Sequence, residues 1–206
     1  GSVLGAYTVI VLSALALGQL LLNFSVIGDN RLVIFASILV CLAAIPICIT
    51  RTVQPAQIPT AIFSPFLVLK TSKAAVVGAL ISGLVGGSFY ALGSVYGLEI
   101  GMEMSEISLM MALGIAGGAL SQLPLGRLSD TKDRRKAILY AMLAGVGAAC
   151  LAWAAPIGII PYAMMLFGAC VMPIYALSLA HASDNIKPES FLEVGTGLLI
   201  TSAIGS

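Results

Sequence analysis

Apolar segments long enough to cross a lipid bilayer make up most of this 206-residue chain. A transmembrane helix needs about 20 predominantly apolar residues. Charged residues contribute 9% of the chain, whereas a soluble domain contains about 25%, and the mean hydropathy is +1.06. The sequence therefore predicts an all-α fold, a polytopic transmembrane helical bundle with about seven spans.

Short polar turns separate most of the expected spans. The spans cover residues 4–22, 32–50, 74–98, 107–125, 137–154 and 160–182, and a seventh begins near Phe191. Pro173 should kink the sixth span, because proline lacks a backbone donor and clashes with the preceding turn. No charged leader precedes the first span, and the chain stops 16 residues into the seventh. We expect the chain to be part of a longer protein.

A longer connection, residues 51–73, follows the second span and contains Pro55, Pro59 and Pro65. Its apolar middle, residues 62–69, is shorter than a span. This length favours a segment that lies at the membrane surface.

The densest charged stretch is residues 126–136, where seven of eleven residues are charged. Lysine and arginine concentrate in cytoplasmic loops of membrane proteins. If this stretch is cytoplasmic and the spans alternate in direction, nine of the ten basic residues lie inside and only Arg31 lies outside. We therefore expect the N-terminus of the chain to be cytoplasmic. Taken alone, the stretch is also compatible with a generic basic loop.

The spacing within this stretch is Gly-x-x-x-Asp-x-x-x-Arg-Arg, and its residues are Gly126, Asp130, Arg134 and Arg135. It resembles the loop motif that follows the second span of each six-span half in the major facilitator superfamily. Two positions depart from the pattern: Thr131 replaces the usual basic residue and Asp133 replaces the usual glycine. Residues 180–184, which precede Pro188 and Glu189, are similar to the bacterial YcaD-like branch of that family.

The resemblance implies a partial major facilitator fold that comprises family spans five to eleven. Residues 1–50 would be the last two spans of the N-terminal half, and residues 51–73 the cytoplasmic linker between halves. Residues 74–206 would be the C-terminal half, cut before its last span. The implied partners are the lipid bilayer, a small-molecule solute and the missing N-terminal spans.

The resemblance also implies a role for the charged loop in switching conformation. Asp130 would meet the positive N-terminal end of a helix of the other half while the inner side is closed. It should point toward the start of the first span. Arg134 would hold the loop by pairing with Asp184, or otherwise with Glu189, on a neighbouring helix of its own half.

Substrate contacts are expected from polar and aromatic residues at mid-membrane. The family resemblance implies that the third and sixth spans of this chain line the cavity. Gln122 is an isolated amide within the fourth span of this chain, and a polar residue inside the membrane is a candidate site residue. The candidates are Phe89, Tyr90, Tyr96, Tyr175, Ser178 and Gln122. Each polar candidate is equally explained by a hydrogen bond to a neighbouring helix.

We find no pattern that indicates catalysis, a cofactor, a metal site or nucleic-acid binding. His181, the single histidine, is explained either as a polar residue at the membrane boundary or as a proton-coupling group. Four cysteines lie within apolar runs and are expected to be small buried hydrophobes: Cys41, Cys48, Cys150 and Cys170.

We therefore expect secondary active transport of a small solute by alternating access, in a protein of the bacterial inner membrane and not an enzyme. Two alternatives remain open at this point. One is a seven-span receptor-type membrane protein that does not transport. The other is an inert fragment of a transporter.

Overall fold

The computed structural model describes residues 2–24, 30–50, 72–131, 133–184, 186 and 190–206. All regular elements in these ranges are helices. They are α1 (Ser2–Leu20), η1 (Leu21–Phe24), α2 (Arg31–Ile49), α4 (Lys73–Glu99), α5 (Met104–Thr131), α6 (Arg134–Ala154), η2 (Ile157–Ile159), α7 (Ile160–Val171), α8 (Ile174–Ser183) and α9 (Phe191–Gly205). The predicted connection, 51–73, lies almost wholly outside the described residues, and so does its apolar middle.

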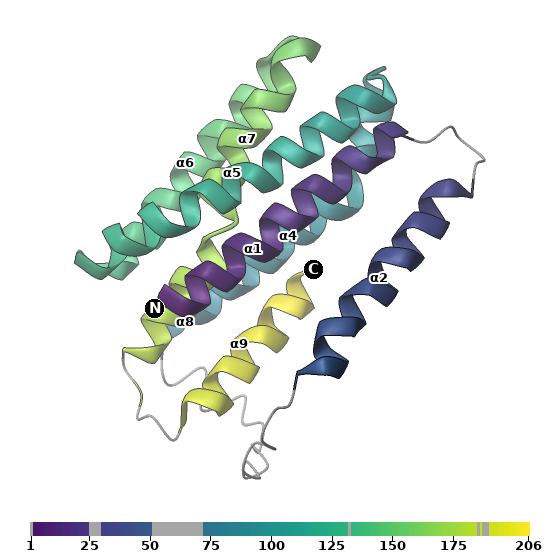
Figure 1. Cartoon of the computed structure of the whole chain (residues 1–206). Coiled ribbons are helices and arrows are strands. Elements are labelled where there is room, and N and C mark those ends of the chain that lie inside the picture. The colour runs from purple at the N-terminus through teal and green to yellow at the C-terminus, as the bar shows by residue number, and fades with distance from the viewer. Residues whose placement is uncertain (1, 25–29, 51–71, 132, 185, 187–189) are drawn as a thin grey trace.

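Six helical segments among the described residues are long and apolar enough to span a membrane, and the fifteen-residue α9 is shorter. The helices alternate in direction. The start of α1, the end of α5 and the end of α8 lie at one end of the bundle (Figure 1), which we name the charged end. The expected all-α transmembrane bundle is confirmed.

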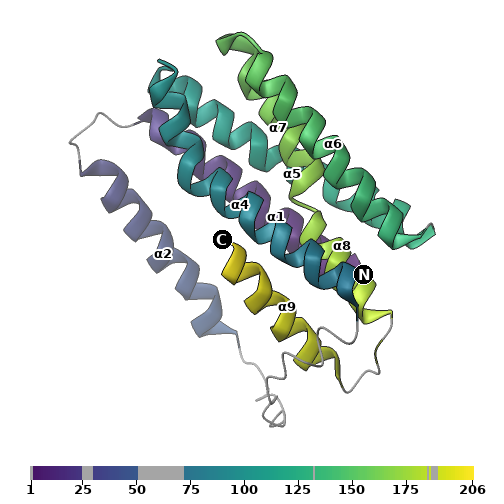
Figure 2. The ribbon, with the colours of Figure 1, turned by 180° about the vertical axis from the view of Figure 1, so that it is seen from behind.

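Helix α5 lies at the centre of the bundle and contacts α1, α4 and α7. One buried cluster joins these four helices, with Leu12, Phe89, Met110, Ile115 and Ile160 among its members. Two smaller clusters connect α6 with α7 and α8, and α4 with α8 and α9. Both views show α2 set apart from the bundle (Figures 1 and 2), and none of its residues is buried.

The α5–α7 crossing is close because glycines form it. A Cβ on Gly168 of α7 would overlap the carbonyl oxygen of Gly114 of α5, and one on Gly117 would overlap the carbonyl oxygen of Met165. Backbones can approach this closely in a membrane only where side chains are absent. The crossing fixes α7 against the central helix.

Proline breaks the sixth span as the sequence predicts. Helix α7 ends at Val171, and α8 starts after Pro173. Pro173 has no backbone N–H to donate to the turn before it, so the helical ladder is interrupted there. The two pieces together form one candidate span, Ile157–Ser183.

Two expectations are wrong in detail. The charged stretch is not a loop, because α5 continues through Pro124 to Thr131 and α6 begins at Arg134. The 28 residues of α5 extend about 42 Å, whereas the apolar core of a bilayer is about 30 Å thick. The charged last turns therefore lie beyond the apolar core and stay helical.

The second wrong expectation is that all four cysteines are buried. Cys41, Cys48 and Cys150 are exposed, and Cys170 is half-buried. In a bilayer the outer surface of a bundle contacts lipid chains, so an apolar thiol is not driven into the protein core.

Candidate functional site

The charged end holds a cluster built from the end of α5, the start of α6 and the end of α8. Asp133 ends the short turn between α5 and α6, and its carboxylate accepts a hydrogen bond of 3.0 Å from the backbone N–H of Arg135. A carboxylate at this position satisfies one free N–H at the helix start. Asp133 thus caps α6 at the position where the loop motif of the resembling family usually has glycine.

Arg134 connects all three helices of the cluster. Its Nε lies 2.6 Å from Asp184 Oδ2 at the end of α8, and its Nη2 lies 2.7 Å from Asp130 Oδ1 on α5. Nη1 also donates to the Ser129 hydroxyl at 3.4 Å. The pairing of Arg134 with Asp184 is the contact expected from the sequence. Glu189, the alternative partner, lies outside the described residues.

Asp130, four residues before Arg134 and at the end of α5, forms an ion pair with it. The expected direction of the Asp130 carboxylate toward the start of the first span stays a prediction. The Asp130 side chain is 59% exposed and is therefore accessible to a further partner.

Arg135 makes a second contact between the start of α6 and the end of α8. Its Nε donates to Nε2 of His181 at 3.4 Å, and His181 is buried on α8. Two consecutive arginines of α6 thus hold two residues on α8 that are three positions apart, which lie on one face of a helix. This contact was not predicted from the sequence. The spacing of His181 and Asp184 opposite an Arg-Arg pair is the signal that could have indicated it.

Gly126, the first residue of the motif, lies within α5, and a Cβ there would meet nothing within 4 Å. Its neighbourhood in the described residues is therefore open. This leaves room beside α5 at the charged end of the bundle.

The ion pairs are weak on energetic grounds. The side chains of Arg134 and Asp184 are 20% and 51% exposed. A solvent-exposed pair contributes at most about 1 kcal/mol to stability. The cluster can therefore hold the turn in place, while small changes of charge suffice to release it.

Three of the aromatic candidates, Phe89, Tyr90 and Tyr96, lie on α4 beside α7. The rings of Phe89 and Tyr90 pack edge to face with centroids 5.4 Å apart, and Phe167 of α7 lies 6.4 Å from Phe89. Phe89 and Tyr96 line one hollow of about 290 Å³ between α4 and α7. The Tyr90 hydroxyl instead donates to the sulfur of Met172, at 3.7 Å.

The remaining candidates do not share this hollow. Tyr175 packs on the cluster between α4, α8 and α9. Ser178 is fully buried where α8 crosses α4 at Gly78. Gln122 is buried in α5, and both its Oε1 and the Ser178 hydroxyl oxygen lack a hydrogen-bond partner among the described residues. Of the candidates, Phe89 and Tyr96 share this hollow, and Tyr90 packs on Phe89.

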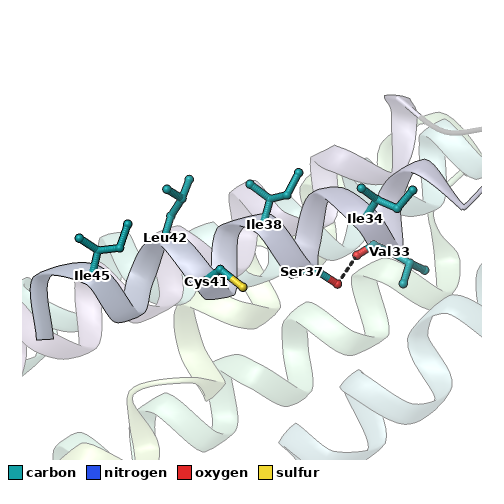
Figure 3. A pocket seen from close by; sticks show the side chains of 7 residues that line it. All are labelled: Val33, Ile34, Ser37, Ile38, Cys41, Leu42 and Ile45. Atoms are coloured by element: carbon teal, nitrogen blue, oxygen red, sulfur yellow. Dashed lines mark hydrogen bonds between the residues drawn. The ribbon is translucent and has the colours of Figure 1, made fainter. Parts of the chain in front are cut away.

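A larger hollow, of about 400 Å³, lies along α2 (Figure 3). Its lining comes from α2 alone, with Ile34, Ile38 and Leu42 in a row, and the Ser37 hydroxyl donates to the carbonyl of Val33. One helix cannot enclose a ligand, so this surface is not a binding site by itself. Within the described ranges, no three His, Cys, Asp or Glu side chains gather as metal ligands would.

Comparison with known proteins identifies the family. A family described as Major Facilitator Superfamily matches residues 1–205. Curated relatives named MFS-type transporter YcaD, from Salmonella paratyphi B and Salmonella newport, are 29% identical over 213 aligned positions. The alignment covers 100% of this chain and 54% of each relative, so the chain spans about half the length of the relatives it matches. No solved structure matches the chain significantly. The chain belongs to the Major Facilitator Superfamily and is an integral membrane protein.

Proposed function

We propose that this chain is part of a secondary transporter that moves a small solute across the membrane by alternating access. The observation that carries the proposal is the charged cluster at the ends of α5, α6 and α8, found in a bundle of the transporter family. Membership of this family supports a transporter and not the receptor-type membrane protein that the sequence left open. The name of the relatives supports the same class.

In the proposed arrangement, α1 and α2 are the last two spans of the N-terminal half, and residues 51–73 form the linker. The helices from α4 onward form the C-terminal half without its last span. The contact between α1 and α5 is then a contact between halves, and a hydrogen bond of 2.8 Å from the Ser108 hydroxyl to the Gln19 carbonyl supports it. The exposed face of α2 would pack on the remaining spans of the N-terminal half.

Transport in this arrangement requires two halves around one site. The α4–α7 hollow with Phe89 and Tyr96 would supply the part of the site that belongs to this chain. Its lining is apolar and aromatic apart from the hydroxyls of Ser88 and Tyr96. This favours a solute with an uncharged apolar portion on this side.

The charged cluster would bias the switch between the two states. Arg134 holds the turn to α8, and the exposed carboxylate of Asp130 can meet the positive end of a helix of the other half when the inner side closes. Opening the inner side would break that contact. A bias of this kind needs little energy, because about 1.4 kcal/mol changes a two-state ratio tenfold.

The experiment compares the 206-residue chain with a longer protein that includes the other half. Each is reconstituted in vesicles loaded with a mixture of small solutes, and the solutes lost from the vesicles are measured by mass spectrometry. We expect a saturable loss through the longer protein and none through residues 1–206. Saturable loss through the short chain would contradict the two-half mechanism, and no loss through the longer protein would contradict transport.

A further inference from the structure

His181 and Arg135 make a contact that the proposed transport mechanism does not use. Arg135 Nε lies 3.4 Å from His181 Nε2, between the first turn of α6 and the last turn of α8. Ion pairing with Asp184 does not explain this contact, because Arg134 already occupies that carboxylate. The turn before α6 is thus fixed to α8 at two places with different chemistry.

The donor and acceptor roles in this contact fix the protonation of His181. A guanidinium has only donors and stays charged at all pH values of interest. Nε2 of His181 must therefore offer a lone pair, which places the proton of the neutral ring on Nδ1. A doubly protonated ring would direct an N–H at the Arg135 N–H and set two cations side by side.

The surroundings contain charges of both signs. Four charged side chains act on the imidazole electrostatically, namely Asp133, Arg134, Arg135 and Asp184. Helices packed on α8 carry further charges at this end of the bundle: Lys73 on α4, Arg127 and Asp130 on α5, and Glu193 on α9. Arg134 engages Oδ2 of Asp184 and Oδ1 of Asp130.

We propose that His181 is a proton-sensitive anchor of the turn between α5 and α6. Neutral His181 accepts the hydrogen bond from Arg135, and protonation of the ring releases Arg135 from α8. The ion pair between Arg134 and Asp184 then holds the turn alone. If the proposed function holds, acidification at the charged end loosens the turn that follows Asp130 and the end of α5, and it favours the inward-open state.

The first test is nuclear magnetic resonance of the protein with ¹⁵N-labelled histidine in lipid nanodiscs. The 206-residue chain has one histidine, and the signal missing from His181→Gln assigns it in a longer protein. We expect the neutral ring to carry its proton on Nδ1, and we expect loss of that preference in Arg135→Met. A neutral ring with its proton on Nε2 in the unaltered protein overturns the proposal.

The second test measures how freely the turn moves as the pH changes. A nitroxide label on Thr131→Cys, in a chain whose four native cysteines are replaced, should become more mobile when His181 is protonated. In His181→Gln the amide oxygen accepts from Arg135 at every pH, so the label should stay immobile throughout. Arg135→Met should give a mobile label throughout.

A pH transition that persists in His181→Gln, or no transition in the parent protein, overturns the proposal. Neither readout depends on transport. The two proposals can therefore fail separately.

Discussion

Single residues determine how closely the helices of this bundle approach and how its charged end is held together. Gly114, Gly117 and Gly168 allow backbone contact between α5 and α7. The side chains of Arg134 and Arg135 together engage four partners: Ser129, Asp130, Asp184 and His181. The glycines act in the apolar interior, where packing is the main attraction between helices. The arginines act at the water boundary, where each contact is weak and reversible.

Gly168→Ala should destabilise the bundle by about 1–3 kcal/mol, because the new methyl group forces α5 and α7 apart. Gly147→Ala is the matched control, since a Cβ at Gly147 meets nothing within 4 Å. Alanine is the better helix former by about 1 kcal/mol, so the control should be neutral or stabilising. Unfolding in detergent, followed by circular dichroism, checks both. Equal losses in the two variants would contradict the close crossing.

The ion pair between Arg134 and Asp184 should couple by at most about 1 kcal/mol, because both side chains reach solvent. A double-mutant cycle with Arg134→Gln and Asp184→Asn measures this coupling from unfolding free energies. The coupling should fall as salt is raised, since screening acts on exposed pairs. A coupling of several kcal/mol that resists salt would show a buried pair and would conflict with the geometry.

Helices, as elements, follow the apolar segments of the sequence closely. All seven expected spans appear as helical segments, and six of them are long enough to cross a membrane. Pro173 breaks the sixth span where its missing N–H requires it. The end of α5 could not be predicted from hydropathy, because a helix continues into water when its residues favour helix and its charges are solvated. Tertiary contacts such as Arg135 with His181 depend on the angle at which α6 meets α8, which no local pattern contains. The pairing of Arg134 with Asp184 could be predicted because the two side chains have opposite charges and the family resemblance makes the helices beside them neighbours within one half.

The alternation of the helices leads to a prediction about sidedness. Single cysteines at Glu103, before α5, and at Thr131, at its other end, should be labelled by an impermeant thiol reagent from opposite sides of the membrane. The positive-inside rule predicts that Thr131 is labelled from the cytoplasmic side. The native cysteines must be replaced first, because three of them are exposed. Labelling of both positions from one side would contradict the spans.

The whole molecule has an unequal distribution of contacts. The helices other than α2 form a packed bundle, whereas α2 has no buried residue. Curated relatives are about twice as long as the part that this chain matches. On the proposed function, the exposed face of α2 packs on the remaining spans of the N-terminal half. On the proposed function, the contact of α1 with α5 is where the two halves move against each other.

The central claim is that the charged end biases two states of a two-half transporter, and Asp130→Asn tests it most directly. Spin labels at Ser2 on α1 and Thr131 on α5, in a longer protein with both halves, report the separation of the inner ends by pulsed electron resonance. Asp133→Asn is the matched control, because it removes a neighbouring charge while asparagine still caps α6.

We expect Asp130→Asn to shift the distance distribution toward the wider, inward-open separation by up to about fivefold, equivalent to about 1 kcal/mol. Asp133→Asn should leave the ratio as it is. An unchanged ratio in Asp130→Asn, or an equal shift in both variants, would contradict the account.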